Sequence, residues 1–242
     1  MNRAIKVTSI EDKAFYSCSG LTSIDIPSSV TSIGEMAFFG CSQLTSANIP
    51  NSVTSIGEKA FMDCSSLPSI KIPNSVTSIE YGTFAWCKVL TSVTIPNNVT
   101  SIGGASFYQC GLTTVTIGEN INNIEFEAFL YCQGINNIYC YAKNVPITSN
   151  NHLIFSSVDI TLHVPADVID LYKSTYPWSQ FKSIVALAED DPNPTGVRKV
   201  MSDEQKYSID RYTIGGIRIS KPQRGLNILH RNDGKIQKVM IR

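Results

Sequence analysis

A stretch of twelve residues recurs throughout the first half of the chain. Residues 30–41 read VTSIGEMAFFGC, and 23 positions later the chain reads VTSIGEKAFMDC. The last full interval is 22 residues, because CGLTT at residues 110–114 is one residue shorter than CSQLTS at residues 41–46. Units of this period are typical of a solenoid, in which each coil buries its apolar face only against its neighbours. The units begin at Val7, Val30, Val53, Val76, Val99 and Ile121.

Three apolar positions recur in every unit, and stacking the units would align each position in a column. Each buried Phe or Ile contributes roughly 1.5–3 kcal/mol. The Phe column comprises Phe15, Phe38, Phe61, Phe84, Phe107 and Phe129. The Ile column comprises Ile10, Ile33, Ile56, Ile79, Ile102 and Ile124, and the third comprises Leu21, Leu44, Leu67, Leu90, Leu112 and Ile135. These columns predict a repeat β-solenoid over residues 1–143, with a short parallel strand in each coil.

Six cysteines share one position of the repeat, which predicts a buried column of thiols acting as small hydrophobes. The chain has no C-x-x-C pair that would favour zinc. Stacked strands are about 4.8 Å apart, within the range of disulfide Cα pairs, so spacing leaves bridges open, with Cys132 and Cys140 as the pair to test. However, side chains in a column point the same way, which suits a disulfide poorly. The column comprises Cys18, Cys41, Cys64, Cys87, Cys110 and Cys132, and Cys140 occupies a buried strand position.

The strand segment of each unit resembles a known repeat family. LTSIDI at residues 21–26 fits the leucine-rich-repeat core L-x-x-L-x-L. With IP after the strand, and with SVTSIG and AFxxC, the units are similar to the BspA-like leucine-rich repeat of bacterial surface proteins. The resemblance implies a solenoid with a parallel strand ladder along one face, a secreted or cell-surface location, and attachment to host proteins.

Residues 144–188 are predicted to cap the array. ITLHVP at 160–165 is a last strand, and residues 166–174 form a short amphipathic helix that presents Val168, Leu171 and Tyr172 on one face. Trp178, Phe181 and Ile184 can then close the open end of the core. A similar segment ends the array in BspA-like proteins. The alternative role for these aromatic residues is a ligand platform.

The chain changes character after residue 188. EDDPNPTG at 189–196 is predicted to be a linker, and residues 197–242 hold 11 Lys and Arg against 4 Asp and Glu, so the formal net charge of zero combines two modules of opposite sign. Alternating strands and Asp233-Gly234 predict a small β module with a hairpin. Its basic side chains fit the solvated face of a sheet, with anionic glycan or nucleic acid as the alternative ligand; we expect no nucleic-acid partner. The module also resembles C-terminal modules of secreted Bacteroidetes proteins, including type IX sorting-type domains.

The cellular compartment must be inferred indirectly. The chain has no apolar run long enough to cross a membrane, and residues 1–10 lack the apolar core of a secretory signal. The array begins within a repeat and without a polar cap, which solenoids need at their ends. We therefore expect a fragment of a longer secreted or surface-attached chain whose signal peptide lies outside it.

No catalytic motif is present in the sequence. The three histidines, His152, His163 and His230, lie in unrelated contexts, and no phosphate loop, zinc-protease motif or nucleophile elbow occurs. We expect no enzymatic activity, no cofactor and no metal site.

The variable positions of the repeat predict where a ligand would bind. One side chain in each unit lies between two buried strand residues, and it changes in charge and size while the core columns stay constant. Lys71 and Tyr139 are the most distinctive of these side chains. We expect this face to bind a host protein, matrix or glycan; a passive spacer or stalk is the alternative. The positions are Asp25, Asn48, Lys71, Thr94, Thr116 and Tyr139, beside a polar row of Ser23, Ser46, Ser69, Ser92, Thr114 and Asn137.

Overall fold

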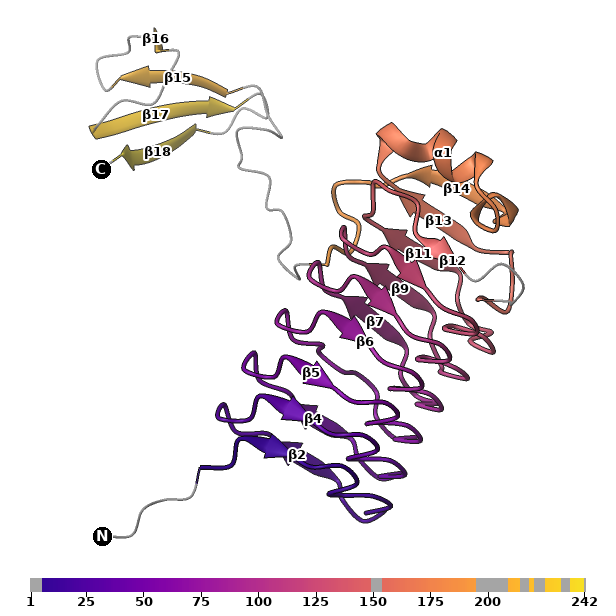
Figure 1. The fold of residues 1–242 in the computed structure, drawn as a ribbon. Helices are drawn as coiled ribbons and strands as arrows, with labels where there is room; N and C mark the ends of the chain where they lie inside the picture. Colours follow the sequence, from indigo (N-terminus) through magenta and orange to yellow (C-terminus); the bar gives the residue numbers. More distant parts are fainter. Residues whose placement is uncertain are drawn as a thin grey trace, which may run out of the picture. The chain divides into compact units, whose positions relative to one another are not determined.

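The computed structural model describes residues 6–148 and 154–194, together with the backbone of strands at 209–213, 218–219, 225–231 and 236–241. The chain divides into two compact units, residues 1–196 and 197–242. The first unit is a parallel-strand β-solenoid of about eight turns, as the repeat predicts. Figure 1 shows its coils stacked one on the next from β2 to β14. We number the repeats as coils 1 to 6, which begin at residues 7, 30, 53, 76, 99 and 121.

The first wall of the solenoid is the predicted strand ladder. Its strands pair in parallel and in register, so that residues at equivalent repeat positions lie side by side. A two-stranded sheet consists of β2 (Ser23–Asp25) and β4 (Ser46–Asn48). A five-stranded sheet consists of β7 (Ser92–Ile95), β9 (Thr114–Ile117), β11 (Asn137–Cys140), β13 (Thr161–Val164) and β14 (Ser183–Ala186). We call the outward side of this wall the ladder face.

A second wall is built from two-residue strands. It also forms two parallel sheets, and most of its strands are the Ser-Ile pair of each repeat. One sheet contains β1 (Ser9–Ile10), β3 (Ser32–Ile33) and β5 (Ser55–Ile56). The other contains β6 (Ser78–Ile79), β8 (Ser101–Ile102), β10 (Asn123–Ile124) and β12 (Ile147–Thr148).

The first wall is interrupted in coil 3. Residues 67–72 form no strand, although Ile70 and Ile72 remain buried at 8% and 3% exposure. Pro68 occupies the position of Thr45 and Thr91 in the neighbouring coils, and Thr45 donates its backbone N–H to the coil before it. Because proline has no N–H, the ladder loses this hydrogen bond. The apolar columns therefore continue through coil 3, whereas the strand pairing stops there.

The third side of the solenoid, which we call the turn wall, comprises residues 12–18 of coil 1 and their equivalents. Phe15 N–H donates to Ala37 O at 2.7 Å, and Phe38 N–H donates to Ala60 O at 2.7 Å. Each junction between coils 1 to 6 has three such bonds, and in all of them the N–H belongs to the earlier coil. Residues with positive φ occupy two positions in each coil: Lys13, Ser17, Met36, Gly40, Lys59, Asp63, Gly82, Trp86, Ala105, Gln109, Glu127 and Tyr131.

The Phe column lies at the centre of the core. Successive rings from Phe15 to Phe129 stack with centroids 5.0 to 5.7 Å apart and with interplanar angles of at most 15°. Phe155 extends the column by one further ring, 5.3 Å from Phe129. The rings from Phe38 to Phe129 are fully buried, which confirms the predicted column. Phe15 is half-buried, because coil 2 covers one side of it only.

The cysteine column is also present, and all seven thiols are free. Each buried thiol from Cys41 to Cys132 lies within reach of a phenylalanine carbonyl, as Cys64 Sγ does with Phe38 O at 3.3 Å. Burial raises the pKa of the Cys41 thiol to about 11 and raises that of Cys64 further. Cys140 is buried, as predicted. The assignment of Cys18 to the core is wrong: its side chain is exposed, since it lies in coil 1.

The C-terminal end of the array is closed by η1 (Ala166–Val168), α1 (Ile169–Ser174) and η2 (Trp178–Gln180). Figure 1 shows α1 at this end, beyond β13. Tyr172 and Trp178 are buried, with ring centroids 5.5 Å apart, and the Trp178 Nε1–H donates to Pro146 O at 3.1 Å. The expected burial of Leu171 is wrong, since it is 48% exposed. The helix changes from 3-10 to α at Val168, and Ile169 packs on the core instead.

The second unit is a four-stranded antiparallel sheet in the order β16-β15-β17-β18. Its strands are β15 (Ile209–Thr213), β16 (Arg218–Ile219), β17 (Gly225–Arg231) and β18 (Ile236–Ile241). The antiparallel pairing of β17 with β18 confirms the predicted hairpin strands, whereas Asp233-Gly234 and the basic side chains lie outside the described residues. No helix within the described ranges is long and apolar enough to cross a bilayer.

Candidate binding surface

The outward positions of the ladder lie in register within each of its two sheets, and Lys71 of coil 3 has the equivalent repeat position between them. Asp25 pairs with Asn48, and Thr94 pairs with Thr116, which pairs with Tyr139. Asp25, Asn48, Lys71 and Thr94 are exposed, and the strand residues that flank them are buried or half-buried. We call these four residues the open ladder face.

The row continues beyond the six positions that the repeat identified. His163 of β13 lies beside Tyr139, and Val185 of β14 lies beside His163. ITLHVP at 160–165 has the same pattern as SIDIP at residues 23–27, and this similarity is the signal that could have placed His163 in the row. Sequence analysis assigned no role to His163, whereas the structure places its ring against Tyr139 with ring centroids 4.3 Å apart.

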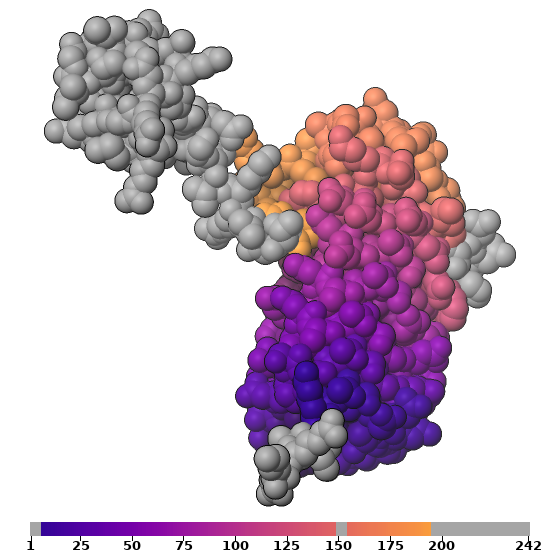
Figure 2. Space-filling view, turned by 60° about the vertical axis from the view of Figure 1, so that its left-hand side comes forward, coloured from indigo at the N-terminus to yellow at the C-terminus, as the bar shows by residue number. Residues whose placement is uncertain are grey.

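The expectation that Thr116 is an outward, accessible residue is wrong. Thr116 is 2% exposed, although its partner Thr94 on the adjacent strand is exposed. The chain returns over this part of the ladder after β14: Leu187 N–H donates to Val164 O at 2.8 Å, and Pro194 is buried. In Figures 1 and 2 the orange end of this unit lies against the magenta coils. We call residues 187–194 the return segment.

The return segment is held by Asp191. Its carboxylate accepts the backbone N–H of Ala188 at 2.7 Å and lies 3.4 Å from His163 Nδ1. His163 Nε2 lies 3.2 Å from Asn137 Oδ1, so both ring nitrogens have polar partners. The predicted linker at 189–196 therefore begins as part of the array surface.

Tyr139 lies within this cluster and is half-buried. Burial, with the nearby carboxylates of Asp191 and Asp190, raises the pKa of the Tyr139 phenol above its usual value. The phenol therefore stays neutral at physiological pH and can donate a hydrogen bond. Tyr139 has less contact surface available than its position in the repeat indicates, because His163 and the return segment occupy part of its surroundings.

The rest of the described surface offers little to hold a metal ion. Within residues 6–148 and 154–194, no group of three or more His, Cys, Asp or Glu side chains has a suitable arrangement. His152, and the side chain of His230, lie outside the described residues.

Comparison with known proteins relates this geometry to bacterial leucine-rich repeat proteins. Residues 8–136 match, in six copies, the family described as BspA type leucine rich repeat region. A leucine-rich repeat protein of T. pallidum, TpLRR, is 26% identical, with 77% of this chain and 83% of that chain covered and a TM-score of 0.62. A leucine-rich cell surface protein of Faecalibacterium prausnitzii is also 26% identical, with 76% and 58% covered and a TM-score of 0.56.

A third structure, the pneumococcal vaccine antigen PcpA, shares the fold at 22% identity, with 69% of this chain and 42% of that chain covered and a TM-score of 0.60. No curated protein matches the chain. The six repeat copies extend over more than half of the sequence, and their strands, Phe column and turn wall follow one period. The chain therefore belongs to the BspA type leucine-rich repeat family.

Proposed function

We propose that the array is a non-catalytic binding module of a secreted or cell-surface protein, and that the open ladder face contacts a host protein, matrix or glycan. One observation carries the proposal: four in-line exposed positions differ in charge and size, while the residues on either side of them stay apolar. Such a surface can change its ligand without changing its core. The similar Faecalibacterium protein is a leucine-rich cell surface protein, which supports the location.

In this proposal the two units of the chain have different roles. Residues 1–188 form the repeats and their cap, residues 189–196 connect, and residues 197–242 form the small basic β module. The resemblance of the last unit to C-terminal modules of secreted Bacteroidetes proteins supports a role in export or attachment.

A binding screen of the full chain against host proteins, matrix proteins and glycans tests the proposal. Lys71→Glu reverses a charge at the centre of the open ladder face, so it should change the on-rate and the salt dependence of any complex. Lys173→Glu on α1 is the matched control, because Lys173 is exposed at the end of the array. We expect the control to bind as the unchanged chain does.

The combined variant Asn48→Ala, Lys71→Glu, Thr94→Ala gives the decisive result. If it binds with unchanged affinity, the ligand uses another surface and the proposal for this face is wrong. If the folded chain binds nothing in the screen, the array is a spacer.

Asp191→Ala removes the contact of the return segment with His163. If Tyr139 belongs to the binding face, Asp191→Ala should strengthen the complex, and Tyr139→Ala should cancel that gain.

A further inference from the structure

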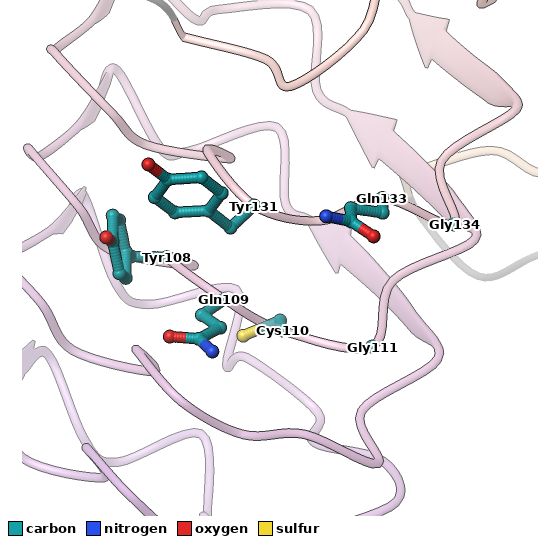
Figure 3. A pocket seen from close by; sticks show the side chains of 7 residues that line it. All are labelled: Tyr108, Gln109, Cys110, Gly111, Tyr131, Gln133 and Gly134. Atoms are coloured by element: carbon teal, nitrogen blue, oxygen red, sulfur yellow. The ribbon is translucent and has the colours of Figure 1, made fainter.

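A hollow lies between coils 5 and 6, where the turn wall leads into the ladder strands β9 and β11. Its volume is about 460 Å³, and it is lined by Tyr108, Gln109, Cys110, Gly111, Tyr131, Gln133 and Gly134. In Figure 3 the two tyrosine rings lie at one side and Gln133 at the other, with Gln109 beside Tyr108. No carboxylate, lysine or arginine lines it. We call it the turn-wall hollow.

The hollow originates in the one-residue deletion of coil 5. Between the cysteine and the leucine, coil 4 has Lys88 and Val89, whereas coil 5 has only Gly111. The shortened backbone is drawn against coil 4, since a Cβ on Gly111 would lie 2.2 Å from Lys88 O. In coil 6, a Cβ on Gly134 would meet Leu112 O of coil 5 at 3.0 Å, so this glycine also allows a close approach between successive coils. The space is therefore specified by the sequence.

Aromatic rings face solvent beside this space. Tyr131 is 51% exposed, and its ring meets Tyr108 edge to face with centroids 5.2 Å apart and an interplanar angle of 88°. Trp86 occupies the repeat position of Tyr131 two coils earlier and is 38% exposed. The core does not need these rings, because the Phe column already fills it. Exposed aromatic side chains of this kind are enriched where proteins bind ligands.

A second hollow continues from the first along the array. Its volume is about 350 Å³, and it is lined by Leu130, Tyr131, Gln133, Ser156 and Ser157. Tyr131 and Gln133 line both hollows, so they lie between two adjacent spaces. Hydroxyl and amide groups supply the polar lining of the second hollow.

We propose that the turn-wall hollow and its neighbour are two subsites for a neutral oligosaccharide chain, with Tyr131 between them. A sugar ring has an apolar C–H face that packs on an aromatic ring, and hydroxyls that pair with amide and hydroxyl side chains. The uncharged lining favours a neutral sugar over an acidic one. An apolar small molecule would need an enclosed pocket, and a protein partner would need a patch of roughly 800 Å².

Titration calorimetry with a panel of short, linear neutral oligosaccharides tests this site. We expect at least one of them to bind the full chain, and Tyr131→Ala and Gln133→Ala each to weaken it by about tenfold or more. Tyr16→Ala is the matched control, since Tyr16 is an exposed tyrosine on the turn wall of coil 1 and should leave the affinity unchanged. Circular dichroism melts would show that each variant is folded.

Three outcomes would overturn the site: no neutral oligosaccharide binds, Tyr131→Ala binds within twofold of the unchanged chain, or only acidic sugars or peptides bind. The proposal deepens the proposed binding function, but it concerns another wall. Loss of sugar binding in Tyr131→Ala, with Lys71→Glu unchanged, would support this site irrespective of the ladder face. The reverse pattern would assign the ligand to the ladder face.

Discussion

Removal of one ring from the centre of the Phe column should be far more costly than removal of an exposed ring from the same wall. Phe61 is fully buried and stacks on Phe38 at 5.0 Å and on Phe84 at 5.7 Å. Phe61→Ala should lower the free energy of unfolding by about 3–5 kcal/mol, because the coils above and below prevent the cavity from collapsing. Phe15→Ala should lower it by about half as much, since Phe15 is half-buried and stacks on Phe38 alone among the described rings.

Urea denaturation followed by circular dichroism measures these losses. Repeat arrays can lose two-state behaviour when one coil is weakened, so hydrogen exchange in coils 3 and 4 is the second measurement. Tyr16→Ala is the control: the ring stacks on Phe39 at 5.0 Å but is 46% exposed, and its loss should be under about 1 kcal/mol. Equal, small losses of unfolding free energy in all three variants would refute the conclusion that the Phe column stabilises the array.

Two further predictions concern the thiols. A thiol reagent should label about one cysteine rapidly in the native chain, Cys18, and all seven after denaturation; rapid labelling of several thiols, or bridges found by mass mapping, would contradict the buried, reduced column. Because burial raises the pKa of Cys41 from 9.0 to about 11, the native state keeps a proton that the unfolded chain loses. The contribution of this thiol to stability should therefore be full below pH 9 and fall between pH 9 and 11, by at most about 1.4 kcal/mol per pH unit. Cys41→Ala should make the slope less steep by that contribution, while the other buried thiols keep theirs, in denaturation measured across this range.

Periodicity made most of the fold predictable. One spacing governs the Phe, Ile and Leu columns, the thiol column and the strand ladder. An assignment made in one coil is therefore supported by the same position in the next coil. Pro68 interrupts the ladder through a property visible in the sequence, its missing N–H. The exposure of Cys18 depends on which coil contains it. The position of a residue within the repeat does not give that information.

The candidate site and the C-terminal cap were less predictable, because each has a determinant that is not periodic. Thr116 is buried by the return segment, which comes from some seventy positions later in the chain. Leu171 turns outward because the helix changes its geometry at Val168. The turn-wall hollow had a visible signal in the deletion at Gly111, but its effect depends on how closely that backbone approaches Lys88.

The hydrogen bonds of the turn wall also orient a set of its peptide dipoles in one direction. Within an ordinary strand the peptide dipoles alternate and nearly cancel. At each junction between coils 1 to 6, the three backbone N–H groups of the turn wall that bond across coils point to the following coil, and the backbone carbonyls that accept them point to the preceding coil. These peptide dipoles, about 3.5 D each, therefore add along the stack as they do along a helix. The turn wall therefore has its positive end toward the C-terminal coils, whereas backbone bonds beside the strands of the other walls, such as Thr31 N–H to Thr8 O and Thr45 N–H to Thr22 O, point the opposite way and oppose this dipole.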